Sequence, residues 1–238
     1  MTIPAQSTGK SLALTLLGKT LGFRDCRPET LAALVEGGRL QTFGKGEAIV
    51  RRGEAFETLF LIVRGSVETS INPREGHRHL ISFLQPGDVA GIIGILDGLG
   101  HVNDMYARER GTELLLMPGA LVREQRARDP RLVHAFELQL AFRSRLLYER
   151  LDTHPGVELE VRLARMVLVF SRLYGVPCED GTVLALKMSQ ADLGDLLGVP
   201  RQRINTALKI LKDQGFIQIK YSTLTVTDMD GMQAFSNY

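Results

Sequence analysis

The chain has 238 residues, 44% hydrophobic and 24% charged, with a formal net charge of +2. This length and composition predict a folded protein with two modest hydrophobic cores. No apolar run approaches the roughly 18 residues of a membrane span, and the N-terminus lacks a charged-then-apolar signal pattern, so a cytoplasmic protein without membrane contact is expected. Cys26 and Cys178 are too few for a disulfide framework, which predicts two unpaired thiols.

Residues 43–117 contain short apolar segments separated by turn signals, including one at 72–76. Alternating apolar residues between such turns predict an antiparallel barrel or jelly roll. A helical lead-in is expected before it. Glycines mark tight turns or close backbone approaches, where a Cβ would not fit. These glycines are Gly53, Gly65, Gly76, Gly87, Gly91 and Gly94.

Residues 129–152 predict one long helix, because Pro130 suits a helix start and the next breaker is Pro155. A seam with steps of three and four residues runs along this helix. The seam consists of Val133, Phe136, Leu140, Arg143 and Leu147. Its periodicity fits pairing with a second copy of the helix, and it equally fits packing against the barrel of the same chain. A second amphipathic helix is expected over residues 159–175.

Residues 189–216 predict two short helices joined by a glycine turn, which is a DNA-binding shape. Ser189 and Asp192 have the spacing of a capping box at the start of the first helix. Gly198 can take the left-handed conformation that ends this helix. Pro200 suits the first turn of the second helix, which we expect to run to Asp213.

The second helix of this pair has an apolar and a polar side. Ile204, Leu208 and Leu211 have the spacing of an inward-facing stripe. The opposite side then carries Arg201, Gln202, Asn205, Thr206 and Lys209. Arg can pair with guanine, and Gln or Asn with adenine, so this side has the chemistry of major-groove readout. A solvated charged helix without a partner would show the same pattern.

Positive charge is concentrated around this helix pair. Residues 187–220 contain six basic and three acidic residues, so this window carries 6 − 3 = +3, whereas the whole chain carries only +2. That concentration favours contact with a phosphate backbone. Residues 216–227 alternate like a small hairpin with its turn near Tyr221 and Ser222, and residues 183–188 read as a strand beside it. Together these elements predict a winged helix-turn-helix.

At these residues the chain resembles the Crp/Fnr family of bacterial transcription regulators. In the front half, the order of the motifs RRGE, LFLIVRGSV, PGD and GIIG resembles the cyclic-nucleotide-binding β-roll of that family. The resemblance implies an α+β fold with an N-terminal β-roll, or jelly roll, over residues 1–128. It further implies a long dimerisation helix over residues 129–153 and a C-terminal winged helix-turn-helix over residues 154–238.

The resemblance also implies a homodimer that reads a palindromic site in double-stranded DNA and acts with RNA polymerase. Arg201 matches the Arg at the start of the family's recognition helix, so it is expected to contact guanine. Gln202 stands where many members have Glu, and Thr206 where many have a base-reading Arg, so the target site should differ from the usual half-site. Ser189 and Gln190, at the start of the first helix, are expected to contact the phosphate backbone of the DNA. The remaining residues that are expected to contact DNA are Arg203, Asn205 and Lys209.

The front domain departs from the pattern of family members that bind cyclic AMP. In those members, the turn after GD-x-x-G holds a Glu for the ribose hydroxyl, and an Arg-Ser pair further on holds the phosphate. The matching positions here are Ile92, Val102 and Asn103. Because burying a phosphate without a cation is costly, cyclic AMP is disfavoured as the effector.

An apolar candidate pocket remains, either empty or specific for another, unknown effector. Its expected residues are Gly91, Ile92, Val102, Asn103, Leu147 and Tyr148, the last two facing the purine position across the dimer. Arg108 and Arg110 lie nearby in sequence, and a response to a cyclic nucleotide through one of them is the alternative. Strand alternation would place both on one face. A third possibility is an interaction module without specific DNA readout.

No cofactor is predicted. An iron-sulfur cluster is excluded, because it needs about four thiolates and the chain has two Cys in all. Haem has no support, since the available histidines are expected to be solvated in or near loops. These are His77, His79 and His101. For redox sensing, Cys26 beside Arg24 and Arg27 is a better setting than Cys178, which Glu179 and Asp180 follow.

A catalytic function is not expected. His77 and His79 have the H-x-H spacing of a cupin metal site, but Phe83 and Leu84 stand where a cupin has its Glu. The sequence also has no nucleophile triad order, paired acid signature or phosphate-binding loop. No metal site is therefore expected.

Overall fold

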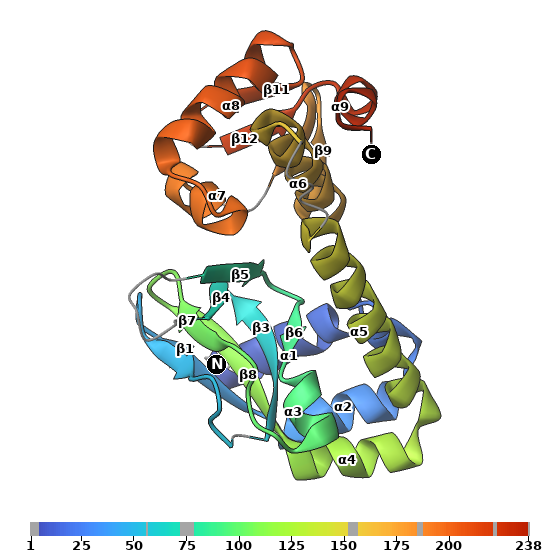
Figure 1. The fold of residues 1–238 in the computed structure, drawn as a ribbon. Coiled ribbons are helices and arrows are strands. Elements are labelled where there is room, and N and C mark those ends of the chain that lie inside the picture. The colour runs from blue at the N-terminus through green and yellow to red at the C-terminus, as the bar shows by residue number, and fades with distance from the viewer. Residues whose placement is uncertain are drawn as a thin grey trace. The chain divides into compact units, whose positions relative to one another are not determined.

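The computed structural model describes residues 5–55, 57–71, 79–151, 157–184, 188–220 and 223–237. The chain divides into two compact units, Met1–Ser144 and Arg145–Tyr238, and the boundary falls inside the long helix α5 (Pro130–Leu151) (Figure 1). Among the helices of the described ranges, none is both long and apolar enough to cross a membrane.

The first unit contains two four-stranded antiparallel sheets, with strand orders β1-β8-β3-β6 and β2-β7-β4-β5. The strands are β1 (Arg39–Phe43), β2 (Ala48–Val50), β3 (Thr58–Arg64), β4 (Val67–Ile71), β5 (His79–Leu84), β6 (Val89–Ala90), β7 (Asp104–Ala107) and β8 (Thr112–Pro118). This arrangement confirms the expected jelly-roll β-roll.

Strand β3 explains why this roll has two cores. Leu59 and Leu61 pack into a cluster with the helices, whereas Phe60 and Ile62 pack into a second cluster with Phe43. Because β3 is buried on both faces, its sequence is a continuous apolar run rather than an alternating one.

Helices pack against the sheet β1-β8-β3-β6 of the roll. They are α1 (Ala5–Leu17), the 3₁₀ turn η1 (Phe23–Asp25), α2 (Pro28–Gly37), α3 (Ile92–Asp97) and α4 (Gly119–Arg128), followed by α5. The helical lead-in was expected, whereas α3 and α4 were not. Positive φ angles occur at Gly53, Gly65, Gly87 and Gly91, in agreement with the turn prediction. Gly94 lies inside α3 and fits the close-approach alternative, because a Cβ there would come 3.1 Å from the Gly100 carbonyl oxygen. Gly76 is outside the described residues.

The start of α5 packs on its own roll. Phe136 is buried, and its ring centroid lies 6.1 Å from that of Phe23. Asp129 fixes the beginning of the helix, because its carboxylate accepts hydrogen bonds from the Thr30 hydroxyl and from the backbone N–H groups of Arg27 and Arg131. The barrel-packing alternative therefore holds for the first half of the seam. Further along, Leu147 is 51% exposed.

The second unit contains one four-stranded sheet of order β11-β12-β10-β9, with helices on both sides of it in the chain. Its elements are α6 (Leu159–Tyr174), β9 (Gly175–Cys178), β10 (Gly181–Leu184), α7 (Gln190–Leu197), α8 (Arg201–Asp213), β11 (Ile217–Lys220), β12 (Thr223–Val226) and α9 (Met229–Ser236). The expected strand beside the hairpin corresponds to β10, which begins at Gly181 rather than at residue 183. Residues 185–187 of the predicted strand lie outside the described ranges. Strand β9 and helix α9 were not predicted.

Candidate nucleic-acid interface

The first helix of the pair begins with the predicted capping box. The Ser189 N–H donates to Asp192 Oδ2 at 2.9 Å, and the Asp192 N–H donates to Ser189 Oγ at 3.1 Å. Gly198 ends this helix in the left-handed conformation, with φ 67°. Pro200 is the residue before α8 rather than part of its first turn, because its ψ of 145° is extended. The helix boundaries otherwise agree with the prediction.

Helix α6 supports the helix pair through Arg162, which the sequence analysis did not identify. Its Nη2 donates to the Leu197 carbonyl at 2.9 Å and so satisfies an acceptor at the C-terminal end of α7. Burial, and secondly the charge of Arg203, lower the pKa of Arg162 from its ordinary value. Because the charge of Arg203 acts on it, the Arg162 guanidinium lies near α8 and adds positive charge there.

Helix α8 presents a polar face above an apolar stripe. Ile204, Leu208 and Leu211 are buried, as predicted from their spacing. All six predicted reader residues are exposed: Arg201, Gln202, Arg203, Asn205, Thr206 and Lys209. The face therefore consists of side chains that can reach base edges or phosphates.

Two hydrogen bonds restrict the side chains of this face. Arg201 Nε donates to Gln190 Oε1 at 3.3 Å, which joins the start of α8 to the start of α7. The Thr206 hydroxyl donates to the Gln202 carbonyl at 3.3 Å. Consequently the hydroxyl of Thr206 is engaged with its own helix, and its methyl group is the part available for an apolar contact.

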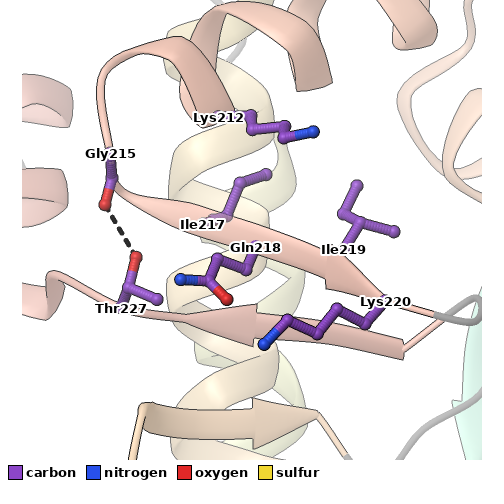
Figure 2. A pocket seen from close by; sticks show the side chains of 7 residues that line it. All are labelled: Lys212, Gly215, Ile217, Gln218, Ile219, Lys220 and Thr227. Carbon is purple, nitrogen blue, oxygen red and sulfur yellow. Dashed lines mark hydrogen bonds between the residues drawn. The ribbon is translucent and has the colours of Figure 1, made fainter.

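The wing next to this pair is the hairpin β11–β12, with Ile217 opposite Val226. Figure 2 shows an open pocket along β11, where the Thr227 hydroxyl donates to the Gly215 carbonyl at 2.7 Å. Of the basic residues counted around the motif, Lys220 lies 3.6 Å from Asp180 in an exposed ion pair. Lys187 and the predicted turn residues Tyr221 and Ser222 lie outside the described residues.

The predicted effector pocket is only partly assembled in the first unit. Gly91 has φ 92°, and a Cβ there would overlap the Thr58 carbonyl oxygen. Ile92 is buried in the core shared with the helices, whereas Val102 is 45% exposed and Asn103 is half-buried. Ile92 and Val102 therefore differ in their exposure to solvent. Leu147 and Tyr148 belong to the second unit, and the side chain of Tyr148 is not among those described.

A cation lies near this region, contrary to the expectation of an uncharged pocket. The Arg143 guanidinium donates a hydrogen bond to the Val89 carbonyl, two residues before Gly91. In the sequence, Arg143 is the one charged residue of the predicted seam along α5. Arg108 and Arg110 do not alternate along a strand, contrary to the prediction, because both follow β7 and precede β8. The Arg108 guanidinium lies over the Phe83 ring, 4.1 Å from its centroid.

The histidines of the roll have different environments from those predicted. His101 is buried and packs edge-on against Phe60, with ring centroids 5.4 Å apart, so the expectation of a solvated loop histidine is wrong for it. Its bulk lies close to Gly91, where a Cβ would come 3.5 Å from His101 Cε1. His79 is the first residue of β5, and His77 lies outside the described residues.

Both cysteines are free thiols, as expected. Cys26 is buried, and its pKa rises to about 11, because of desolvation first and the charges of Asp129 and Asp25 next; Arg131 acts in the opposite direction. A raised pKa disfavours the thiolate, so Cys26 has the environment of an ordinary buried thiol rather than that of a redox sensor. Cys178 is exposed on β9. Over the part of the chain that the structure describes, no group of three or more His, Cys, Asp or Glu residues could hold a metal ion.

A β-roll domain combined with a winged helix-turn-helix defines a class of DNA-binding transcription regulators. Residues 40–129 match the model of the cyclic nucleotide-binding domain, and residues 161–235 match the Crp-like helix-turn-helix domain. The chain belongs to the Crp/Fnr family of transcription regulators. Its described fold agrees with that assignment in both units.

The chain is similar in sequence to transcription regulators, and solved structures share its fold. The cAMP-activated global transcriptional regulator Vfr of Pseudomonas aeruginosa is 26% identical over 182 residues, covering 75% of this chain and 84% of Vfr. The global nitrogen regulator of Nostoc sp. is 24% identical over 190 residues, covering 79% and 84%. FixK2 from Bradyrhizobium japonicum has the same fold, with a TM-score of 0.72 at 22% identity over 83% of this chain and 96% of FixK2. A CooA mutant from Carboxydothermus hydrogenoformans has a TM-score of 0.72 at 18% identity, covering 84% and 88%.

Proposed function

We propose that this regulator is a cytoplasmic homodimer that reads a palindromic site in double-stranded DNA and acts on RNA polymerase without requiring cyclic AMP. The observation that carries the proposal is the exposed face of α8, where Arg201 is oriented by Gln190. A helix with this face fits the major groove, and two copies related by a twofold axis fit half-sites about 34 Å apart. No catalytic activity is assigned to the protein.

Base readout is assigned to the start of α8. Arg201 would pair bidentately with guanine and Gln202 with adenine, and Asn205 has the same amide chemistry one turn later. Thr206 would offer its methyl group to a thymine methyl, because its hydroxyl donates to the Gln202 carbonyl. These four side chains would determine the sequence preference.

Phosphate contacts are assigned to the residues around these readers. Ser189 and Gln190 lie at the N-terminal end of α7, where free N–H groups and the helix dipole favour phosphate. Arg203 and Lys209 are exposed cations on α8. Such contacts position the protein and make its affinity dependent on salt, but they do not distinguish sequences.

Dimerisation is assigned to the later part of α5. Phe136 packs in the core of the roll, so it is not available to a partner. Leu147, one of the seam residues, is 51% exposed and supports an apolar contact with a second copy. A twofold dimer also matches the need for two recognition helices.

Independence from cyclic AMP rests on the chemistry of the roll. Ile92 is buried and apolar, so it cannot accept a bond from a ribose hydroxyl, and Val102 brings no charge to a phosphate. The relatives Vfr and CRP are described as cAMP-activated, but that property belongs to those proteins. The curated matches support the regulator class and leave the effector open.

The test is an anisotropy titration of the full chain against a duplex selected from a random library, at fixed salt, with and without cyclic AMP. The proposal predicts tight specific binding that the nucleotide leaves unchanged. Binding that appears only with cyclic AMP would overturn the effector part. If no sequence is selected, the helix pair has lost specific readout, and the protein is an interaction module instead.

Arg143 favours a second candidate, a regulator that responds to a cyclic nucleotide or another anion through an unusual contact. Its guanidinium already donates to the carbonyl of Val89, the first residue of β6. A phosphate could replace that carbonyl as the acceptor. Under this candidate, the nucleotide raises DNA affinity and Arg143→Met abolishes the rise, while affinity without nucleotide is retained.

A further inference from the structure

Strand β11 is an edge of the sheet in the second unit, and it borders a pocket. The strand order places β12 on one side of β11, and within the described residues no strand pairs with its other side. The pocket has a volume of about 490 Å³ and opens between β11 and the end of α8 (Figure 2). Its lining residues are Lys212, Gly215, Ile217, Gln218, Ile219, Lys220 and Thr227.

This pocket combines an apolar strand face with a basic rim. Ile217 is buried beneath it, and Ile219 is 38% exposed although it is a large apolar side chain. Lys212 and Lys220 are exposed on either side of the strand face. The ion pair of Lys220 with Asp180 is itself exposed, so it is weak and can exchange for another carboxylate.

The backbone of β11 also offers hydrogen-bonding groups at this edge. The Thr227 N–H donates to the Phe216 carbonyl, which makes Phe216 and Thr227 a hydrogen-bonded pair of the antiparallel ladder. Pairs alternate along such a ladder, so the N–H and C=O groups of Ile217 and Ile219 point away from β12. They form a template for an added strand.

The opposite edge of the same sheet is different. Strand β9 contains Pro177, which has no N–H to donate, and Glu179 and Asp180 follow it. Its exposed apolar residue, Val176, is 51% exposed. The two edges therefore match in exposed apolar surface, but only β11 combines a basic rim with an unbroken set of edge groups.

We propose that the edge of β11 binds an extended, acidic segment of a partner protein by strand addition. The added strand would pair with the backbone of Ile217 and Ile219, place an apolar side chain against Ile219, and direct carboxylates to Lys212 and Lys220. The apolar surface favours a protein segment over a nucleic-acid backbone, because that backbone is charged and polar. Lys212 is also eleven residues from Arg201, roughly 16 Å along the helix, so the base-reading end of α8 stays free.

The test uses the full chain and a fluorescein-labelled peptide of about ten residues that alternates Val and Asp. The same peptide with Lys in place of Asp is the charge control. We expect saturable binding of the acidic peptide but not of the Lys-containing control. The acidic peptide should also shift the NMR signals of the Ile217 and Ile219 amides. Ile219→Asp should weaken binding at least tenfold, about 1.4 kcal/mol, whereas Val176→Asp on the other edge should change it less than about twofold.

Three results would overturn the proposal. The first is absence of saturation by the acidic peptide, or equal losses in the two variants. The second is an approximately tenfold loss of DNA affinity in Ile219→Asp at fixed salt, which would assign the edge to the DNA interface. The third is a change in sedimentation mass in that variant, which would assign the edge to contact between copies. Thermal unfolding of both variants checks that they are folded.

Discussion

Arg201 Nε and Gln190 Oε1 lie 3.3 Å apart, in a hydrogen bond between the first turn of α8 and the first residue of α7. The capping box of Ser189 and Asp192 fixes that first turn of α7. Arg201 is therefore held from outside its own helix, and less side-chain entropy remains to be lost when it binds a base.

Arg201→Ala should cost roughly 1 to 3 kcal/mol on the selected DNA site and relax discrimination at one base pair. The reason is the loss of a bidentate contact to guanine. The measurement is competitive anisotropy with duplexes that differ at single positions. Gln190→Ala should give a smaller loss at the same base pair, because it removes the side chain that orients Arg201 and keeps the backbone N–H of residue 190 for a phosphate.

Lys209→Ala is the matched control on the same helix. It should weaken all sequences equally and reduce the slope of log affinity against log salt by about 1. If Arg201→Ala instead lowers affinity uniformly, Arg201 contacts phosphate and the assigned guanine contact is wrong.

Asp129→Asn should destabilise the protein by roughly 2 to 4 kcal/mol in urea unfolding, because three donors converge on this buried carboxylate. Thr30→Val removes one of those donors and should cost about 1 kcal/mol. An Asp129→Asn variant as stable as the parent protein would show that the carboxylate contributes nothing at the start of α5.

The contribution of Asp129 should also depend on pH. Burial alone would raise its pKa, but hydrogen bonds from Arg27, Thr30 and Arg131 lower the pKa below its ordinary 3.8. The stabilisation is therefore complete above that ordinary value and is lost as pH falls through the lower folded value. Unfolding curves of parent and Asp129→Asn should converge in acid. A stability difference that stays constant through this range would contradict the assignment.

Gly91→Ala should destabilise the first unit by roughly 3 kcal/mol or more, because a Cβ at φ 92° would overlap the Thr58 carbonyl oxygen. Gly98→Ala is the matched control at the other end of α3. Gly98 is also left-handed, but it has open space around its Cβ position, so about 1 kcal/mol is expected. Thermal unfolding of the two variants separates the steric overlap from the cost of the conformation.

Maleimide should label Cys178 and leave Cys26 unmodified at neutral pH. Cys178 is exposed, whereas burial and neighbouring carboxylates raise the pKa of Cys26 to about 11. Mass spectrometry should find one label in native protein and two in denaturant. Cys178→Ser should then show no native label, and rapid labelling of Cys26 would contradict its assigned environment.

The helix pair could be predicted from the sequence because its signals are local. A capping box, a left-handed Gly198 and the inward stripe of Ile204, Leu208 and Leu211 all lie within a few residues of the structure they specify. Helix α3 was missed because it has only six residues and a glycine at each end, which is also the pattern of strands and turns. The assigned DNA contacts and the domain boundaries at 128 and 153 stay predictions.

The sequence-based expectations that differ from the structure concern side chains whose surroundings are formed by residues distant in sequence. The pKa of Cys26 is raised first by burial and then by the charges of Asp129 and Asp25, and the burial and Asp129 come from parts of the fold far away in sequence. His101 is buried because Phe60 lies against it. Likewise, the hydrogen bond of Arg143 to the Val89 carbonyl follows from how α5 packs, which periodicity alone could not fix.

The sheet of the second unit joins the chain on both sides of the helix pair, because β10 precedes the pair, β12 follows it, and Thr182 lies opposite Val226. The pair is thus an insertion whose two ends are anchored on one framework. Its outward side chains contribute little to folding, since exposed substitutions usually change stability by less than about 0.5 kcal/mol. A new operator preference can therefore evolve through successive changes on α8 without passing through an unstable intermediate.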